Sequence, residues 1–206
     1  MKTAKIILAI AVLGFLGNSV QAQTYTDLYY TVGIPMGETA DKIDGDASWR
    51  SFGFEWGQHL EEDRSIGFEL GWHVYSGRES NARIPIGDNG TGILQGTKLT
   101  YYNIFPMQAN YRYFLGDGDV RPFVGLAVGT TFISERIDMG IYSVTSDRFR
   151  FSGTPEIGGE YWVHSRMRVF VSARYFYAFQ NKQDDIDGLG DPFSSLMLRI
   201  GIRSNM

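Results

Sequence analysis

The adjacent residues His164 and Ser165 are the first candidates for chemistry in this chain of 206 residues, which has three histidines and no cysteine. A hydroxyl with a base within hydrogen-bond reach can act as a nucleophile. These two residues lie in a short polar segment, 164–166, between two strand-like stretches. Because neighbouring residues of such a turn are expected to point apart, the pair predicts no catalytic site.

The two other histidines, His59 and His73, fall on the polar faces of two successive strand-like stretches. Glu55 and Glu69 share those faces. The four side chains could therefore meet inside the fold, where a base and a carboxylate could cooperate. We expect them to be structural groups of a packed interior, so the sequence predicts no catalytic residue.

Acidic residues gather between positions 184 and 191, with Asp184, Asp185, Asp187 and Asp191 in one Gly-containing segment. Calcium binds several carboxylate and carbonyl oxygens, but an EF-hand loop needs acids at alternate positions and a later glutamate. This spacing fails that test, and we read the segment as a solvated loop; a bridging role for divalent ions stays open. The same holds for Asp41, Asp44 and Asp46. We therefore predict no resident metal and no cofactor, and the absence of cysteine excludes thiolate zinc and iron–sulfur sites.

Strict alternation of apolar with polar or small residues is the dominant pattern of the chain. In 65–75, for example, Ile66, Phe68 and Leu70 alternate with Gly67 and Glu69. A period of two is typical of strands with one apolar face. It predicts eight strands, over residues 28–34, 49–60, 65–75, 99–113, 121–133, 149–163, 167–179 and 194–203.

The connections between these strands alternate in length. Segments 61–64, 116–119 and 164–166 are short, whereas 37–48, 76–98, 134–148 and 180–193 are long and polar. Even-stranded membrane barrels have short turns at one end and long loops at the other. We therefore predict an all-β fold, an eight-stranded antiparallel up-and-down transmembrane β-barrel, as one domain over residues 23–206. Eight strands leave a lumen that side chains can fill.

The N-terminal segment has the three parts of a secretory signal peptide. Lys2 and Lys5 precede an apolar run from Ile6 to Leu16, and a small-residue site ends at Ala22. We predict cleavage after Ala22, so that 1–22 is removed. The formal net charge of −4, which becomes more negative after that cleavage, argues against a nucleic-acid partner.

Charged residues indicate which face of the barrel points inward. Beyond residue 22, lysine occurs only at 42, 98 and 182, in or beside long segments, whereas arginine and glutamate occupy the polar faces of the strands. An enclosed lumen favours arginine forks paired with carboxylates. We predict a structural lumen network formed by Glu55, Glu69, Glu156, Glu160, Arg112, Arg168, Arg174, Arg199 and Arg203.

Aromatic residues gather towards both ends of the strands, as in the two girdles of a membrane barrel. The expected girdle members are Tyr111, Tyr113, Tyr161 and Trp162 at the short-turn end, and Trp49, Trp72, Tyr101, Phe132, Tyr177 and Phe179 at the long-loop end.

Two segments carry a family resemblance. The stretch YRYFLGDGDVRPFVGLAVGTTF at 111–132 resembles the central hairpin of the small outer-membrane β-barrel family of OmpA-like, OmpX-like and opacity-type proteins. GGEYW at 158–162, followed by a short turn and residues 168–175, resembles its sixth and seventh strands. The resemblance implies a bacterial outer-membrane location, with roles in adhesion, envelope integrity or limited permeation. It also implies outer-membrane lipid, lipopolysaccharide, the barrel-assembly machinery and an unidentified extracellular ligand as partners.

Three functions remain open at this point. The first is a structural or interaction protein that presents four long extracellular loops above a filled lumen. The second is a narrow, gated, porin-like channel for small solutes. The third is a lipid A-modifying enzyme, a class that the resemblance includes, although the spacing of the histidines and serines does not favour it.

Overall fold

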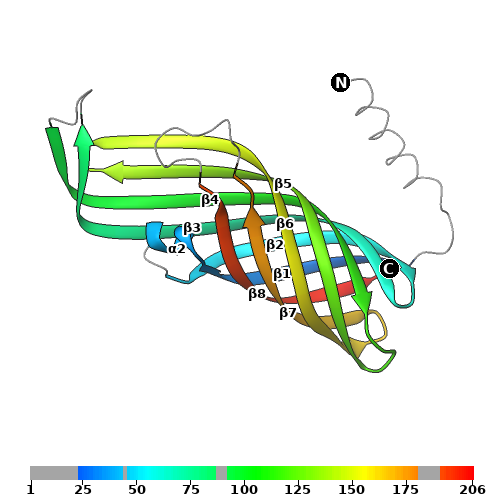
Figure 1. The fold of residues 1–206 in the computed structure, drawn as a ribbon. Coiled ribbons are helices and arrows are strands. Elements are labelled where there is room, and N and C mark those ends of the chain that lie inside the picture. The colour runs from blue at the N-terminus through cyan, green and yellow to red at the C-terminus, as the bar shows by residue number, and fades with distance from the viewer. Residues whose placement is uncertain (1–22, 44–45, 87–91, 181–190) are drawn as a thin grey trace, which may run out of the picture.

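Eight strands form a closed antiparallel ring in the computed structural model, which describes residues 23–43, 46–86, 92–180 and 191–206 (Figure 1). Each strand pairs with the next along the chain, and β1 pairs with β8 to close the barrel. The predicted signal peptide lies outside the described residues and stays a prediction. The strands are β1 (Thr24–Pro35), β2 (Ser48–Glu61), β3 (Arg64–Ile86), β4 (Gly92–Phe114), β5 (Val120–Met139), β6 (Tyr142–His164), β7 (Met167–Ala178) and β8 (Phe193–Asn205).

The two faces of the strands have the predicted polarity. In β1, Tyr25, Asp27, Tyr29 and Thr31 are buried, whereas Leu28 between them is 63% exposed. Apolar side chains thus cover the outer wall, and polar and aromatic side chains fill the inside, the reverse of a soluble barrel. The predicted eight-stranded transmembrane barrel is confirmed.

Two of the predicted long loops are wrong. Most of 76–98 and 134–148 belongs to the hairpins β3–β4 and β5–β6, which are paired in register from Val74↔Asn103 to Ile86↔Gly92 and from Ser134↔Asp147 to Met139↔Tyr142. The alternation fades here because this part of the sheet lies beyond the closed ring, where no enclosed lumen and no lipid sort its two faces. Backbone pairing continues without that sorting.

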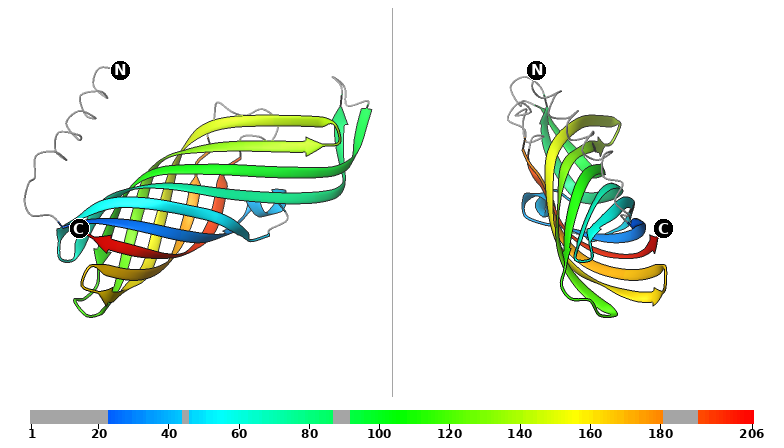
Figure 2. Two further views of the ribbon diagram at one scale, coloured as in Figure 1. Left: turned by 180° about the vertical axis from the view of Figure 1, so that it is seen from behind. Right: turned by 90° about the vertical axis from the view of Figure 1, so that its right-hand side faces the viewer.

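The longer hairpins project beyond the ring as a curved sheet (Figure 2). Pairing of β2 with β3 ends at Arg50↔Val74, and pairing of β6 with β7 ends at Ser152↔Ala178. Beyond those points the four strands β3–β6 pair only among themselves, and we call this part the extension. The two strands of the β3–β4 hairpin bend before its end, where the register shifts between Glu79 and Ala82 and Asn81 has a φ of 62°.

A short helix, α2 (Glu38–Lys42), follows β1 in a segment predicted as loop. The hydroxyl of Thr39 accepts a hydrogen bond of 3.0 Å from the backbone N–H of Ser194 in β8, and Ile43 after the helix is 1% exposed. The helix is therefore fixed against the rim of the barrel. In the described part of the chain, no helix has the length and apolar character needed to cross a membrane.

Candidate functional site: the filled lumen

Arg112 of β4 is the centre of the charged interior. Its guanidinium donates to both carboxylate oxygens of Glu55, at 2.7 and 2.6 Å, and to Asp27 at 3.3 Å and Glu156 at 3.2 Å. Glu55 and Asp27 lie on β2 and β1, and Glu156 lies on β6, so one side chain connects four strands. All four residues are buried, and such charges are tolerated because each has opposite partners.

A second group of ion pairs lies towards the short-turn end. Arg203 donates to both oxygens of Asp27 at 2.8 Å and to Glu160 at 2.9 Å. Arg168 also donates to Glu160, and Arg121 lies 3.5 Å from the same carboxylate. Asp27 is thus shared between two arginines, which joins this group to Arg112.

A third group crosses the lumen towards the long-loop end. Arg174 of β7 donates to Glu69 of β3 at 2.9 Å, from the opposite wall. Arg199 of β8 lies 3.4 Å from Glu69 and also donates to Glu156. Glu156 is bound by Arg112 as well, so the three groups form one continuous network.

The register explains why the arginines are needed. Asp27 faces Glu55 across β1 and β2, and Glu55 faces Glu69 across β2 and β3. Like charges at directly opposed positions destabilise a sheet. Arginines of β4, β7 and β8 reach these three acids and replace that repulsion with attraction.

All nine residues that the sequence placed in the lumen are buried there, and each takes part in at least one ion pair of the network. Two further members, Asp27 and Arg121, were missed. Asp27 was missed because β1 begins four residues before the predicted strand. Continuing the alternation backwards from Thr31 through Tyr29 would have placed Asp27 on the inner face. Arg121, two residues before Phe123 on the inner face of β5, could have been found in the same way.

An apolar layer fills the barrel on the long-loop side of the network. Phe193 is its centre, with ring centroids 5.2 Å from Tyr75, 5.6 Å from Tyr102 and 6.1 Å from Phe176. Ile43, next to α2, belongs to the same buried cluster. This apolar layer and the ion-pair network together occupy the lumen at two successive levels.

His59 and His73, which could have met inside the fold, lie far apart. His59 pairs with Ser65 in register and His73 with Ser51, so the two histidines lie about eight residues apart along the strands, roughly 26 Å. The ring of His59 instead lies 5.2 Å from that of Tyr25. Both histidines lie on predicted strand segments, but the antiparallel register places them near opposite ends of the β2–β3 pairing.

His164 and Ser165 do not point apart, contrary to the prediction from their adjacency. The Ser165 hydroxyl lies 3.1 Å from Nδ1 of His164, and the Ser165 backbone N–H donates to the same nitrogen at 2.8 Å. The tight turn between β6 and β7 brings the two groups together. The backbone donor occupies Nδ1, and within the described residues no carboxylate hydrogen-bonds to this exposed imidazole.

The acidic segments are only partly described. Residues 181–190 and Asp44 lie outside the described residues, whereas Asp191 forms an ion pair of 2.6 Å with Lys42. Among the residues that the structure describes, no group of three or more potential ligands could hold a metal ion.

A row of aromatic rings crosses the outer wall at the long-loop end. Neighbouring centroids lie 5.3, 6.2, 6.1 and 5.1 Å apart, and the row consists of Phe52, Trp72, Phe105, Phe132 and Phe149 on β2 to β6. We call it the outer aromatic row. Trp162, predicted in the opposite girdle, instead points into the lumen mouth, where Arg168 lies 3.6 Å from its ring.

Comparison with known proteins identifies the family. The family model of the outer membrane protein beta-barrel domain matches residues 8–191. The chain belongs to this family. Its location is therefore the bacterial outer membrane. A search of curated protein sequences gives no match.

Solved structures share the fold at low sequence identity. Neisserial surface protein A has 14% identity and a TM-score of 0.54, with 88% of this chain and 96% of that chain covered. OprG from Pseudomonas aeruginosa has 13% identity and a TM-score of 0.53, with coverages of 90% and 96%. The outer membrane protease OmpT from Escherichia coli has 8% identity and a TM-score of 0.51, with coverages of 89% and 97%. A protease and surface proteins thus share this architecture, so the fold alone does not assign an activity.

Proposed function

We propose that this outer-membrane barrel is a closed, non-catalytic interaction protein that presents its extension to the cell exterior. The observation that supports this most is the double filling of the lumen. Ion pairs such as Arg174–Glu69 span it from wall to wall, and the apolar layer around Phe193 fills it again above them. Opening a solute path would require separating buried ion pairs, which is costly.

The extension supports the interaction role. It carries charged residues that reach solvent, among them Arg78, Glu79 and Arg136, and Arg136 pairs with Asp138. Binding residues are concentrated on segments held by a rigid scaffold. A sheet anchored in a closed barrel satisfies that requirement, and its ligand is an unidentified molecule outside the cell.

Planar-bilayer conductance tests the closed lumen. The wild-type protein should give no single-channel steps. Arg199→Ala and Phe193→Ala, each of which removes one side chain from one of the two filling levels, should also be silent because the other level remains intact. Steady steps from the wild-type protein that change in amplitude with Arg199→Ala would refute the proposal and favour the narrow channel.

A lipid A deacylase assay tests the non-catalytic part. We expect no turnover by the purified, refolded protein. Turnover that is abolished by His164→Ala would overturn this expectation and assign a catalytic role to the His164–Ser165 contact.

A further inference from the structure

A bulge in β2 places a cation and an indole together on the outer wall. The register passes from Thr31↔Ser51 to Gly33↔Ser48, so Trp49 and Arg50 both lie opposite a single residue of β1. Both side chains are exposed, and Trp49 is 66% accessible. Two successive residues of β2 therefore face outward, which regular alternation does not allow.

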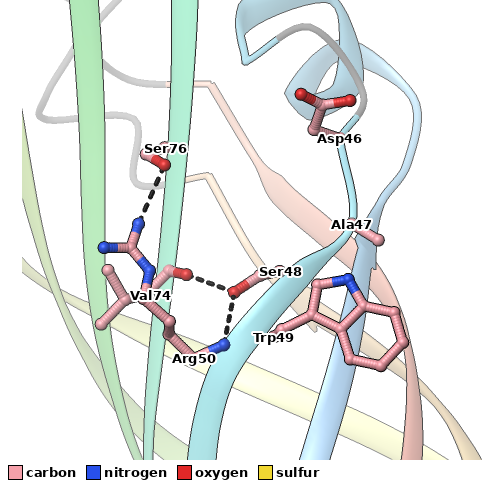
Figure 3. A pocket seen from close by; sticks show the side chains of 7 residues that line it. All are labelled: Asp46, Ala47, Ser48, Trp49, Arg50, Val74 and Ser76. Atoms are coloured by element: carbon pink, nitrogen blue, oxygen red, sulfur yellow. Dashed lines mark hydrogen bonds between the residues drawn. The ribbon is translucent and has the colours of Figure 1, made fainter.

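These residues line a hollow of about 230 Å³ between β2 and β3 (Figure 3). Arg50 leans towards β3, where its Nη2 donates to the hydroxyl of Ser76 at 2.9 Å. The Ser48 hydroxyl donates to the backbone oxygen of Val74 and so ties the two strands together below it. Among the described residues Arg50 forms no ion pair, and donors of its guanidinium remain free for a ligand. Asp46 is the one acidic residue of the lining, and Figure 3 shows it on the opposite side from Arg50.

The hollow lies directly beyond the outer aromatic row. Arg50 precedes Phe52 by two residues along β2, and on the antiparallel strand β3 Val74 and Ser76 follow Trp72 by two and four residues. Two residues of a strand span about 7 Å. Aromatic belts lie at the boundary between the acyl chains and the headgroups of a membrane. Arg50 is therefore at the level of the lipid headgroups.

We propose that this hollow binds a phosphate monoester on the headgroup of an outer-membrane lipid. A guanidinium matches the planar, forked geometry of phosphate oxygens, and Arg is favoured where phosphate is recognised. Arg50 supplies the contact, Ser76 holds the guanidinium in place, and the Trp49 indole packs beside the headgroup. Arg78, exposed two residues beyond Ser76, adds a second positive charge to the same wall. The proposal rests on the membrane position of the barrel and not on whether its lumen is closed.

Native mass spectrometry of the full mature protein in phosphate-free maltoside micelles tests this site. Bisphosphorylated lipid A and fully dephosphorylated lipid A serve as probes. The variants are Arg50→Ala and the matched control Arg136→Ala, another outward-facing arginine of the long-loop end, which pairs with Asp138 at 2.9 Å. We expect Arg50→Ala to weaken binding of the phosphorylated probe about tenfold, as for the loss of one charged hydrogen bond, with Arg136→Ala at the wild-type level.

The dephosphorylated probe separates phosphate recognition from general lipid adhesion. The dephosphorylated probe should bind to the wild-type protein about as weakly as the phosphorylated probe binds to Arg50→Ala. Its affinity should be the same for Arg50→Ala as for the wild-type protein. Equal affinity of wild-type protein and Arg50→Ala for the phosphorylated probe would overturn the proposal. Displacement of that probe by equimolar inorganic phosphate would show that the hollow binds free phosphate and not a lipid headgroup. Heat-modifiable gel migration establishes that each variant is folded, and Arg50→Gln, which keeps a donor for Ser76, replaces any unfolded alanine variant.

Discussion

Each buried arginine stabilises the barrel in two ways. It forms its own ion pairs, and it reduces the repulsion among the carboxylates that it binds. Arg112 alone forms ion pairs with Asp27, Glu55 and Glu156. Removing one member of a buried ion network leaves its partners charged and unpaired, which costs more than the pairing itself contributes. The consequences of a substitution therefore depend on how many acids it leaves unpaired.

Arg112→Ala should destabilise the folded barrel by about 3–5 kcal/mol, because three buried carboxylates lose a partner at once. Urea unfolding in lipid vesicles, followed by gel migration of unheated samples, measures the effect. Arg136→Ala, which removes an exposed arginine, is the control and should unfold as the wild-type protein does. An unchanged midpoint for Arg112→Ala would show that the network does not stabilise the barrel.

At the scale of the strands, inward glycines and inward aromatic rings form complementary pairs. Tyr25 lies over Gly57, Tyr29 over Gly53 and Phe123 over Gly158, and each pair is directly opposed in register. A Cβ at these glycines would fall within about 2.6 Å of the ring it faces. These three glycines are needed because the ring opposite each of them lies directly against its bare backbone.

Gly158 and Gly159 make this dependence testable. A Cβ at Gly158 would lie 2.5 Å from the Val171 oxygen and 2.6 Å from the Phe123 ring, whereas one at Gly159 would have its nearest contact at 3.8 Å. Gly158→Ala should cost about 1–3 kcal/mol through overpacking, and Gly159→Ala should be neutral or slightly stabilising. The same urea series measures both, and equal midpoints for the two variants would contradict the pairing.

The outer part of the β3–β4 hairpin should be dispensable for barrel stability. Arg78 and Leu99 are register partners, so a two-residue Asn-Gly turn that replaces 79–98 can close the shortened hairpin. We expect the shortened protein to refold with heat-modifiable migration and an unchanged urea midpoint. Failure to refold would show that the tip of the β3–β4 hairpin stabilises the ring.

The sequence predicts the strands of this fold wherever the two faces of a strand lie in different environments, because each environment selects its own kind of side chain. Lipid on one side and a crowded lumen on the other produce the alternation of β2, which was predicted to within one residue at each end. Beyond the ring that contrast is absent, so the sequence pattern predicts loops where β3 to β6 in fact continue as strands. The partners of each charge were unpredictable for another reason: the pairing of Arg174 with Glu69 depends on the diameter and register of the closed ring.

At the scale of the whole molecule, the alternation of short turns and long hairpins implies one orientation in the membrane. Barrels of this kind have short periplasmic turns. The turn between β4 and β5, with Asp117, should therefore face the periplasm, and the turn between β5 and β6, followed by Ser143, should face the exterior.

The absence of cysteine makes this orientation directly measurable. Ser143→Cys should react with a membrane-impermeant maleimide on intact cells, because it lies at the far end of the β5–β6 hairpin. Asp117→Cys should react only after the outer membrane is permeabilised. Labelling of Asp117→Cys on intact cells, with Ser143→Cys protected, would show the opposite orientation.

The contact between β1 and β8 also determines when the barrel can be completed. Asp27 and Arg203, 176 positions apart, are direct partners across it, and the Met206 backbone N–H donates to the Thr24 oxygen at 2.9 Å. Every other strand pairs with its neighbour along the chain and can form as a local hairpin, whereas this closure joins the most distant segments and carries the largest loop-closure entropy. We therefore expect ring closure to be the last and slowest step of folding. Until the ring closes, β1 and β8 are open edges and Asp27 lacks Arg203. The time needed for closure therefore determines how long these edges can pair with other strands.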